Sequence, residues 1–416
     1  MLPQGWLRRP LGDIAQITSG GTPDRSTPSY WGGNIPWLTT GEIQFNTITD
    51  SAEKITEFGL KNSSAKLFPA GTLLMAMYGQ GKTRGQIAKL GIEAATNQAC
   101  AAILFDASND PNFYFQYLAS QYEELRELGN AGTQKNLNGG ILKRILVPVP
   151  PVREQRRIAH ILSTWDQAIA TAEQLLANSL TQKMLFAQQV LTGKKRLASF
   201  NASGHRKNTP YGSIPADWDY PQIGDIAEEI SEKLGLVAPH PVLSCTKHHG
   251  LVDSLKYFKK QVFSVNTSTY KVVPRGCFVY ATNHIDEGSI GYQDLYDAGL
   301  VSPMYTIFKT TGRAVDTYLF ALLKTEHYRQ IFSSAINASV DRRGSLRWKD
   351  FQRIHVPLPP VEEQQAIANV LAQSDREVKL IKDQLRLLRE EKSALMSQLL
   401  TGKRRVRLPA DEAETA

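Results

Sequence analysis

The sequence contains the stretch Val147-Pro-Val-Pro-Pro-Val-Arg-Glu-Gln155 twice, the second time as Val356-Pro-Leu-Pro-Pro-Val-Glu-Glu-Gln364. The second copy follows the first at a distance of 209 residues, and Leu191-Thr-Gly-Lys194 recurs as Leu400-Thr-Gly-Lys403 at the same distance. No residue has been inserted or lost between these landmarks. Such an invariant spacing is expected for a helix whose register is fixed.

Each segment between the two landmarks is predicted to be a long helix. The two prolines block helix formation before it, Glu-Gln in the first turn suits the positive end of the macrodipole, and the glycine ends the helix before a basic cluster. Apolar residues follow at alternating spacings of four and three, the 3.5-residue repeat of a coiled-coil seam. The seam positions are Ile158, Leu162, Trp165, Ile169, Ala172 and Leu176 in the first copy, and Ile367, Leu371, Ser374, Val378, Ile381, Leu385, Leu388, Leu395 and Leu399 in the second.

Two separate core helices are the alternative, but the matched lengths favour pairing of the two helices with each other. A helix of roughly 38 residues is about 57 Å long. The polar linker from about Lys194 to Ser213 is too short to run back along such a helix and cross over as well, so we expect an antiparallel pair with one globular domain at each end.

A second pair of landmarks marks where each copy begins. Pro3, Trp6 and Gly12-Asp-Ile-Ala15 match Pro215, Trp218 and Gly224-Asp-Ile-Ala227 at a distance of 212 residues. The stretch before the Pro-Pro motif is otherwise weakly similar between the copies. The two copies therefore share a frame and differ in the globular part that the frame carries.

The globular segments 11–150 and 223–360 alternate short apolar runs with turn residues, which indicates mixed, strand-rich domains. The expected elements are strands at Leu73–Tyr78 and Cys277–Tyr280 and helices at Asn112–Glu127 and Asp316–Ser333.

The predicted fold class is therefore α+β, with two tandem globular domains, each followed by a long α-helix, and the helices pairing as an antiparallel coiled coil with pseudo-two-fold symmetry. The expected divisions are a first globular domain at 1–152, a first helix at 153–193, a linker at 194–213, a second globular domain at 214–361, a second helix at 362–402 and a basic, then acidic tail at 403–416.

The composition favours an anionic partner and a reducing compartment. The 416 residues include 48 Lys and Arg against 40 Asp and Glu, for a net charge of +8, which fits nucleic acid although many basic proteins bind none. The three cysteines are far apart and odd in number, so neither a disulfide framework nor a zinc site is indicated. Without an apolar signal core or a run of 18 apolar residues, we expect a soluble cytoplasmic protein that makes no membrane contact.

The motifs that resemble enzyme sites each lack a feature that the site requires. The stretch Ala76–Thr83 loosely fits a phosphate-binding loop, but Arg84–Ala88 and Gly91 follow and suit a hairpin better than a helix. The corresponding Asn283–Ser289 lacks the lysine. Adjacent His248 and His249 cannot converge on a metal as an i, i+4 pair would. Neither an Asn-Pro-Pro-aromatic motif of adenine methyltransferases nor a nuclease carboxylate cluster is identifiable, so we assign no catalytic residue and no metal ligand.

The remaining candidate site residues are polar, aromatic and basic residues in loops. These are residue types that contact bases and phosphates. For any single residue a solvated surface is the simpler interpretation. The candidates in the first copy are Thr18, Ser19, Gly20, Thr22, Tyr30, Trp31, Thr39, Thr40, Lys82, Arg84, Gln134, Lys135 and Asn136; those in the second are Lys247, His248, His249, Lys259, Lys260, Asn283, His284, Arg342, Arg343 and Arg347.

Taken together, these motifs resemble the specificity subunit of type I restriction–modification systems over essentially the whole chain. The frame motifs are Pro-Pro-x-x-Glu-Gln with the following Ile-Ala, and the Leu-Thr-Gly-Lys helix ends. Patterns within the globular parts resemble two classes of target-recognition domain: Ser19–Pro23 with Tyr30-Trp31 and Ile35–Trp37 in the first, and Tyr270–Val273 with Gly288–Gly291 and Val301–Pro303 in the second.

The resemblance implies a subunit without catalytic activity that binds double-stranded DNA, two methyltransferase subunits and restriction (translocase) subunits. S-adenosylmethionine, ATP and magnesium are expected on those partners, and no cofactor on this chain. The two recognition domains would read the two parts of an interrupted site, with the helices as a ruler for the gap. Domains on one face of B-DNA meet half-sites about 10 base pairs apart, and unlike domains imply unlike half-sites.

Some positions depart from a symmetric pattern. Arg153 stands where the second copy has Glu362, and Trp165 where it has Ser374, so methyltransferase contacts are expected to differ between the copies. Asn283-His284 stands where related domains often carry an arginine.

Two alternatives stay open: a fused restriction or modification enzyme, which would cut or methylate DNA alone, and a coiled-coil adaptor whose binding is insensitive to salt and DNA sequence.

Overall fold

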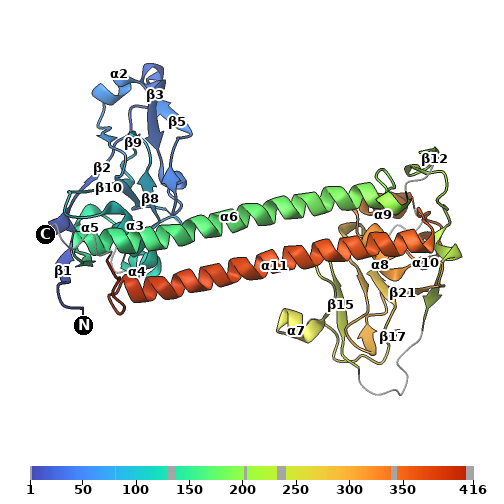
Figure 1. Cartoon of the computed structure of the whole chain (residues 1–416). Helices are drawn as coiled ribbons and strands as arrows, with labels where there is room; N and C mark the ends of the chain where they lie inside the picture. The colour runs from blue at the N-terminus through green and yellow to red at the C-terminus, as the bar shows by residue number, and fades with distance from the viewer. Residues whose placement is uncertain are drawn as a thin grey trace. The chain divides into compact units, whose positions relative to one another are not determined.

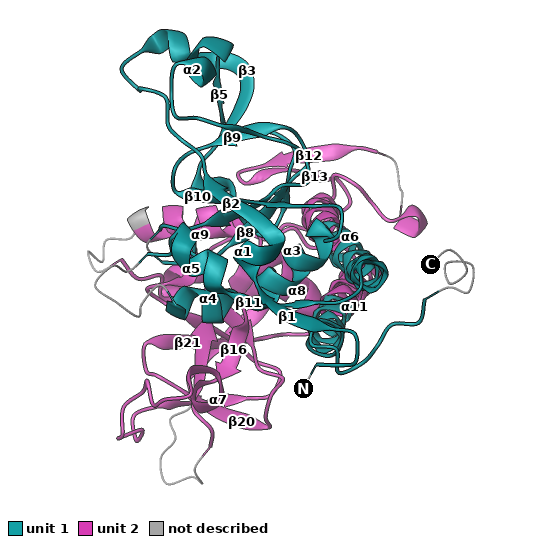
Figure 2. Ribbon diagram, turned by 90° about the vertical axis from the view of Figure 1, so that its left-hand side faces the viewer, with its two compact units in different colours: residues 1–174, 383–416 teal, residues 175–382 magenta. Residues whose placement is uncertain are grey.

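The computed structural model describes residues 2–79, 81–128, 136–200, 204–231, 240–338 and 344–408. The chain divides into two compact units, one formed by residues 1–174 and 383–416 and the other by residues 175–382 (Figure 2). The boundaries of these units fall within the two long helices.

Unit 1 contains a sheet in the order β2-β10-β7-β8-β4, a second sheet in the order β5-β3-β9-β6, and the pair β1-β11. Its elements before the long helix are β1 Leu7–Pro10, α1 Leu11–Ile14, β2 Ala15–Ser19, η1 Pro28–Tyr30, β3 Trp31–Leu38, η2 Thr40–Glu42, β4 Thr47–Ile48, β5 Glu53–Ile55, α2 Glu57–Lys61, β6 Leu67–Phe68, β7 Leu73–Ala76, β8 Ile87–Leu90, β9 Ala94–Thr96, β10 Cys100–Phe105, α3 Pro111–Ser120, α4 Tyr122–Leu128, α5 Gly139–Arg144 and β11 Leu146–Val149 (Figure 1).

Unit 2 repeats the central order as β14-β21-β18-β19 and adds the pairs β12-β13, β15-β16 and β17-β20. Its elements between the long helices are η3 Ala198–Phe200, β12 Arg206–Thr209, β13 Gly212–Pro215, η4 Ile223–Asp225, β14 Ala227–Ile230, β15 Leu243–Thr246, β16 Gly250–Asp253, α7 Ser254–Phe258, β17 Lys271–Pro274, β18 Phe278–Ala281, η5 Ile285–Glu287, β19 Ile290–Tyr292, β20 Ala298–Val301, β21 Tyr305–Thr310, α8 Asp316–Leu323, α9 Glu326–Ala338 and α10 Trp348–Phe351.

The elements expected from sequence need three corrections. Residues 112–127 form two helices, α3 and α4, instead of one. Residues 316–333 likewise divide into α8 and α9, because the Thr325 hydroxyl accepts the backbone N–H of Tyr328 at 3.3 Å and so caps a new helix. The third is an addition: the polar linker leads into an antiparallel hairpin, β12-β13, that was not expected. The hairpin expected after Ala76 is confirmed: β7 and β8 pair antiparallel, with Met75 opposite Ile87.

The long helices are α6, Val152–Leu191, and α11, Val361–Leu399, with 40 and 39 residues. In unit 1 Asp166 accepts a hydrogen bond from Lys392, and Glu173 pairs with Arg389, so the two helices run in opposite directions. In unit 2 Lys183 pairs with Asp375. The Asp375–Lys183 pair is the 209-residue equivalent of Asp166–Lys392. The expected antiparallel pairing is therefore present, with the same interhelical bridge in each unit.

The seam residues are all buried or half-buried, and at both ends of the pair they merge with a domain core. Ile158 and Leu162 of α6 and Leu399 of α11 belong to one cluster with Trp6, Phe113 and other core residues of unit 1. Ile367 and Leu371 of α11 and Val190 of α6 join the equivalent cluster in unit 2. Each domain core is thus closed by the start of one long helix and the end of the other.

Unit 2 has a groove of about 430 Å³ between its two helix segments, lined by Ser179, Gln182, Lys183, Leu185, Phe186, Gln189, Ser374, Glu377 and Val378. We attribute the groove to Ser374, which stands at the seam position that the indole of Trp165 takes in unit 1. A serine removes most of the volume that an indole supplies, and a packed core does not collapse fully around such a loss.

Replacing Trp165 with serine should therefore lower the free energy of unfolding by about 2 kcal/mol, because a half-buried indole loses its contacts and leaves a gap. The reverse change, Ser374→Trp, fills an existing groove and should not lower the midpoint of urea unfolding. Equal losses in the two variants would contradict the assignment of the groove to this position.

Candidate nucleic-acid interface

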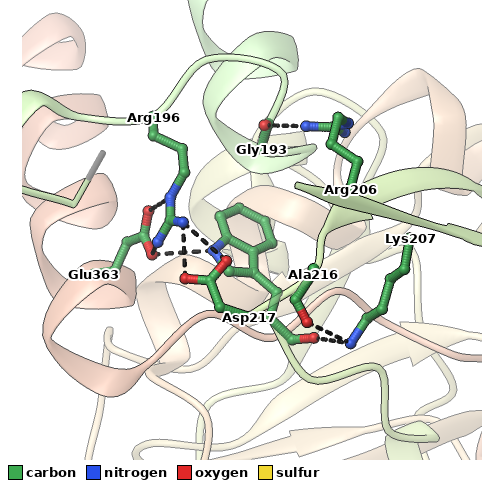
Figure 3. Close-up of polar contacts among 8 residues, drawn as sticks. Gly193, Arg196, Arg206, Lys207, Ala216, Asp217 and Glu363 are labelled. Carbon is green, nitrogen blue, oxygen red and sulfur yellow. Dashed lines mark hydrogen bonds and ion pairs between the residues drawn. The ribbon is translucent and has the colours of Figure 1, made fainter. Parts of the chain in front are cut away.

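A buried carboxylate joins the second globular domain to the long helices. Glu363, in the first turn of α11, accepts the indole N–H of Trp218 at 3.0 Å and the Nε–H of Arg196 at 2.9 Å. Asp217 binds the same guanidinium at 2.8 Å, so Arg196 lies between two carboxylates (Figure 3). Hydrogen bonding to Glu363 raises the pKa of Arg196, so a guanidinium cation lies against this fully buried side chain.

Unit 1 contains the equivalent joint. Glu154, in the first turn of α6, accepts the indole N–H of Trp6 at 3.2 Å and the Nε–H of Arg405 at 3.0 Å. Arg405 also donates to the carbonyl of Gln4 at 3.0 Å, because Gly5 stands where unit 2 has Asp217. Arg405 remains about half exposed, with 47% of its side chain accessible, whereas Arg196 is 10% exposed.

The glycine of each Leu-Thr-Gly motif belongs to the same joint. Gly193 and Gly402 adopt positive φ angles of 61° and 73°. A Cβ atom on either residue would collide with a proline ring, that of Pro215 in unit 2 and that of Pro3 in unit 1. The motif was read from sequence only as a helix stop. It also lets the start of each copy dock against the end of the opposing helix.

The glutamine of the Pro-Pro-x-x-Glu-Gln motif fixes each domain on its own helix. Gln155 is fully buried, accepts the backbone N–H of Asp110 at 2.7 Å and donates to the carbonyl of Pro150 at 2.8 Å. Gln364 likewise accepts the N–H of Val315 at 2.7 Å and donates to the carbonyl of Pro359. Asp110 and Val315 are the N-cap residues of α3 and α8.

The sequence indicated a basic cluster after the glycine at the end of each long helix, without a partner for it. In the structure one residue of each cluster, Arg196 or Arg405, pairs with the glutamate that opens the facing helix. The motifs that recur after 209 residues and those that recur after 212 residues look unrelated along the chain. In space they meet in one joint per unit.

In unit 2 the structure gathers part of the candidate nucleic-acid surface. Lys247, His248 and His249 are exposed in the turn between β15 and β16. The Lys324 ammonium donates to the carbonyls of Lys247 and Gly288, both at 2.8 Å, and so ties this turn to the loop that carries Asn283 and His284. Burial lowers the pKa of Lys324, which fits a structural cross-link rather than a phosphate contact.

In unit 1 hydrogen bonds join the loop between β7 and β8 to α4. Arg126 of α4 donates to the carbonyl of Gly81 at 2.8 Å, and Arg84 donates to the carbonyl of Arg126 at 3.1 Å. Lys82 is exposed at this loop. Arg329 holds the corresponding loop of unit 2 in the same way, by donating to the carbonyl of Asp286 at 3.0 Å. Arg84 thus has a structural contact, while Lys82 is the more accessible cation.

The Ser-Gly-Gly-Thr motif of unit 1 lies where two segments cross closely. A Cβ on Gly20 would overlap the backbone of Thr96, and one on Gly21 would overlap Ser64. Thr22 bonds to Gln98 at 2.5 Å, and Thr18 accepts from Lys66 at 2.9 Å. The glycines therefore have a packing role that explains the motif without a ligand.

The other candidates in unit 1 also have internal contacts. The Trp31 indole donates to the carbonyl of Asp24 at 3.0 Å, and the Arg25 guanidinium covers its ring at 4.1 Å. Tyr30 packs on Phe58 of α2. Thr39 caps the one-turn helix η2, in which Thr40 is the first residue.

The remaining candidates differ in what the structure says of them. Lys259 and Lys260 are exposed after α7, Asn136 is exposed, and Arg347 precedes α10 as its N-cap residue. His284 bonds to Glu287 at 3.1 Å. Ser19 ends β2 and is half-buried. Gln134, Lys135, Arg342 and Arg343 lie outside the described residues.

Residues 2–79, 81–128, 136–200, 204–231, 240–338 and 344–408 contain no group of three or more His, Cys, Asp or Glu side chains placed to hold a metal ion. In these same ranges, no helix combines the length and apolar character needed to span a membrane.

The two joints should differ in their sensitivity to loss of the arginine. Arg196→Ala leaves the fully buried Glu363 without its cation, which should destabilise the chain by about 3 kcal/mol. Arg405→Ala also leaves a nearly buried carboxylate, since the Glu154 side chain is 5% exposed, but water can replace the half-exposed guanidinium, so the cost should be smaller, about 2 kcal/mol. Urea unfolding of the two variants checks the order, and an equal or reversed order would show that burial of the pair does not set its contribution.

The comparisons with known proteins agree with this architecture. The model of the type I restriction modification DNA specificity domain matches residues 3–181 and 257–389. The MjaVIII specificity subunit of Methanocaldococcus jannaschii is 24% identical over 426 residues, covering 98% of this chain and 94% of that protein. The MjaIX specificity subunit of the same organism is 27% identical over 239 residues, covering 54% and 52%.

Solved structures show the same fold. The type I restriction-modification S subunit from M. genitalium has a TM-score of 0.56 at 15% identity, with 96% of each chain covered. The HsdS subunit from Thermoanaerobacter tengcongensis has a TM-score of 0.51 at 16% identity, with coverage of 97% and 98%. Because the family model matches most of the chain, in both copies of the frame, the chain belongs to the type I restriction–modification DNA specificity family.

Proposed function

We propose that this chain is the non-catalytic subunit that reads a DNA site in two unequal parts, one per recognition domain, and directs partner enzymes to it. The observation that carries the proposal is the duplicated joint. An equivalent Trp–Glu–Arg connection in each unit holds a globular domain of different construction. A frame repeated this closely, carrying two different domains, is the arrangement required to read two different half-sites.

The difference between the domains lies outside their common sheet order. Unit 1 extends the central sheet with β4 and adds the sheet β5-β3-β9-β6, whereas unit 2 adds the pairs β15-β16 and β17-β20. Sequence is read by side chains on such additions, while phosphate contacts mainly position the protein. We therefore expect the two half-sites to differ.

The helix surfaces are the proposed docking sites for two methyltransferase subunits. In unit 2 α6 exposes Leu180, Met184 and Leu185. The positions 209 residues later, on α11, are Arg389, Ser393 and Ala394. The two methyltransferases would then meet unlike surfaces. S-adenosylmethionine would be bound by these methyltransferases, and ATP and magnesium by restriction subunits that join the complex.

Methylome sequencing of a host expressing the chain with its adenine methyltransferase should reveal methylated adenines in a motif of two unequal parts separated by a gap. A host with the methyltransferase alone is the control and should lack that motif. Methylation that does not change when this chain is removed would contradict the proposed role and favour the alternative of a coiled-coil adaptor.

We infer that the helix pair sets the gap between the half-sites. Inserting one heptad after Ala172 and one after Ile381, its equivalent, preserves the seam and lengthens the pair by about 10 Å at 1.5 Å per residue. The gap should grow by about three base pairs at 3.4 Å each, with both half-sites unchanged. Methylome sequencing of the variant checks this, and an unchanged gap would show that the helices are no ruler.

A further inference from the structure

Each recognition domain carries a long basic segment without a single acidic residue. The segments 58–92 and 254–285 each contain five lysines and arginines and no Asp or Glu. In both units the segment begins in a one-turn helix, α2 or α7, and continues through the central strand β7 or β18. Two dissimilar domains therefore share a charge pattern that their common frame does not require.

The helix α7 presents apolar and basic side chains together. Leu255, Tyr257 and Phe258 are 53%, 44% and 37% exposed. Lys256, Lys259 and Lys260 are exposed beside them. Figure 1 shows α7 at the periphery of unit 2, away from α8 and α9. Aromatic side chains of this size are normally buried, so a group of them at the surface indicates a binding surface.

The carboxylate that caps α7 is engaged by neighbouring groups. Asp253, the N-cap residue, accepts the backbone N–H of Lys256 at 3.1 Å and the hydroxyl of Tyr296 at 2.7 Å. Lys259 ends the helix in the left-handed region at φ 54°. Lys256 lies 3.7 Å from the same carboxylate and donates to the Tyr296 hydroxyl at 2.7 Å, whereas Lys259 and Lys260 are exposed after the helix.

The helix is continuous with the candidate nucleic-acid loops of unit 2. The Tyr257 hydroxyl and Nδ1 of His249 are hydrogen-bonded at 3.1 Å, and the two rings lie 5.4 Å apart. His249 belongs to the turn that Lys324 ties to the loop of Asn283 and His284. The aromatic side chains of α7 therefore extend a surface that already carries exposed lysine and histidine.

Unit 1 repeats the arrangement on α2. The Thr56 hydroxyl caps this helix by accepting the N–H of Gly59 at 3.0 Å. Phe58 is 56% exposed and packs on Tyr30 with the rings tilted and their centroids 5.5 Å apart. Lys61 and Lys66 are exposed near it in sequence. Neither α2 nor Phe58 was singled out from the sequence.

We propose that α7 and α2 are DNA-contacting elements whose exposed aromatic side chains, Tyr257 with Phe258 and Phe58, pack on the bases of their half-sites in a groove of the duplex. The neighbouring lysines contact the flanking phosphates. Charge favours DNA over an apolar protein surface, because exposed lysines outnumber the acidic residues Glu57 and Asp253 beside these rings and complement phosphates. Apolar wedges beside cations are a known means of kinking a base step. The inference rests on the proposed function.

The test uses the full chain in complex with its methyltransferase and duplexes bearing the wild-type motif or single mismatches. Tyr257→Ala/Phe258→Ala should reduce discrimination against mismatches in one half-site by about 10- to 100-fold, and Phe58→Ala should do so in the other half-site. Tyr257→Phe should keep the wild-type discrimination, because the ring rather than the hydroxyl makes the contact.

The lysines provide a second, different readout. Lys259→Gln/Lys260→Gln should weaken binding to all duplexes by a similar factor and lower the slope of log affinity against log salt by about two, without changing the preferred motif. Leu146→Ala, at an exposed leucine on β11 of unit 1, is the matched control and should change neither quantity.

Two failures are distinguishable. A wild-type complex without a two-part motif would overturn the proposed function itself. The other failure is a wild-type complex that has the two-part motif while the aromatic variants, which unfold like the wild type, discriminate as well as Leu146→Ala. That result would overturn only the assignment of α2 and α7 to DNA contact.

Discussion

The buried pair of a glutamate in the first helical turn and an arginine from the opposing helix end is the interaction on which this architecture depends. A fully buried carboxylate such as Glu363 is tolerated only when its oxygens are hydrogen-bonded and its charge is compensated. Trp218 supplies one donor and Arg196 the cation, and these come from the domain start and from the segment after α6. One carboxylate therefore requires the start of a domain, the start of its helix and the end of the other helix to be present together.

This requirement explains which parts of the fold were predictable from sequence. The long helices, their pairing and the frame motifs follow from short-range rules of helix capping and heptad spacing, and the structure has them. Residues such as Glu154 and Gln155 were recognised as a motif, but their partners Trp6, Arg405 and Asp110 lie far away in sequence, so spacing rules did not connect them.

The candidate DNA surface was less predictable, because residue type alone does not separate contact from packing. Gly20, Thr22 and Trp31 resemble ligand-binding loop residues, yet each has a close internal partner. Conversely, Phe58 and Tyr257 look like core residues in the sequence, and only their exposure distinguishes them. Both lie at the start of segments without acidic residues, 58–92 and 254–285, and these segments were visible in the sequence.

The two units also show how a symmetric frame becomes directional. The interhelical bridge Asp166–Lys392 has its equivalent in Asp375–Lys183, so both units keep the same register. Trp165 has no such equivalent, and Ser374 leaves a groove in unit 2. A partner that meets the helix pair therefore encounters an indole at this seam position in one unit and a groove beside a serine in the other. This difference lies in the scaffold and not in the recognition domains, so exchanging the domains would leave it unchanged.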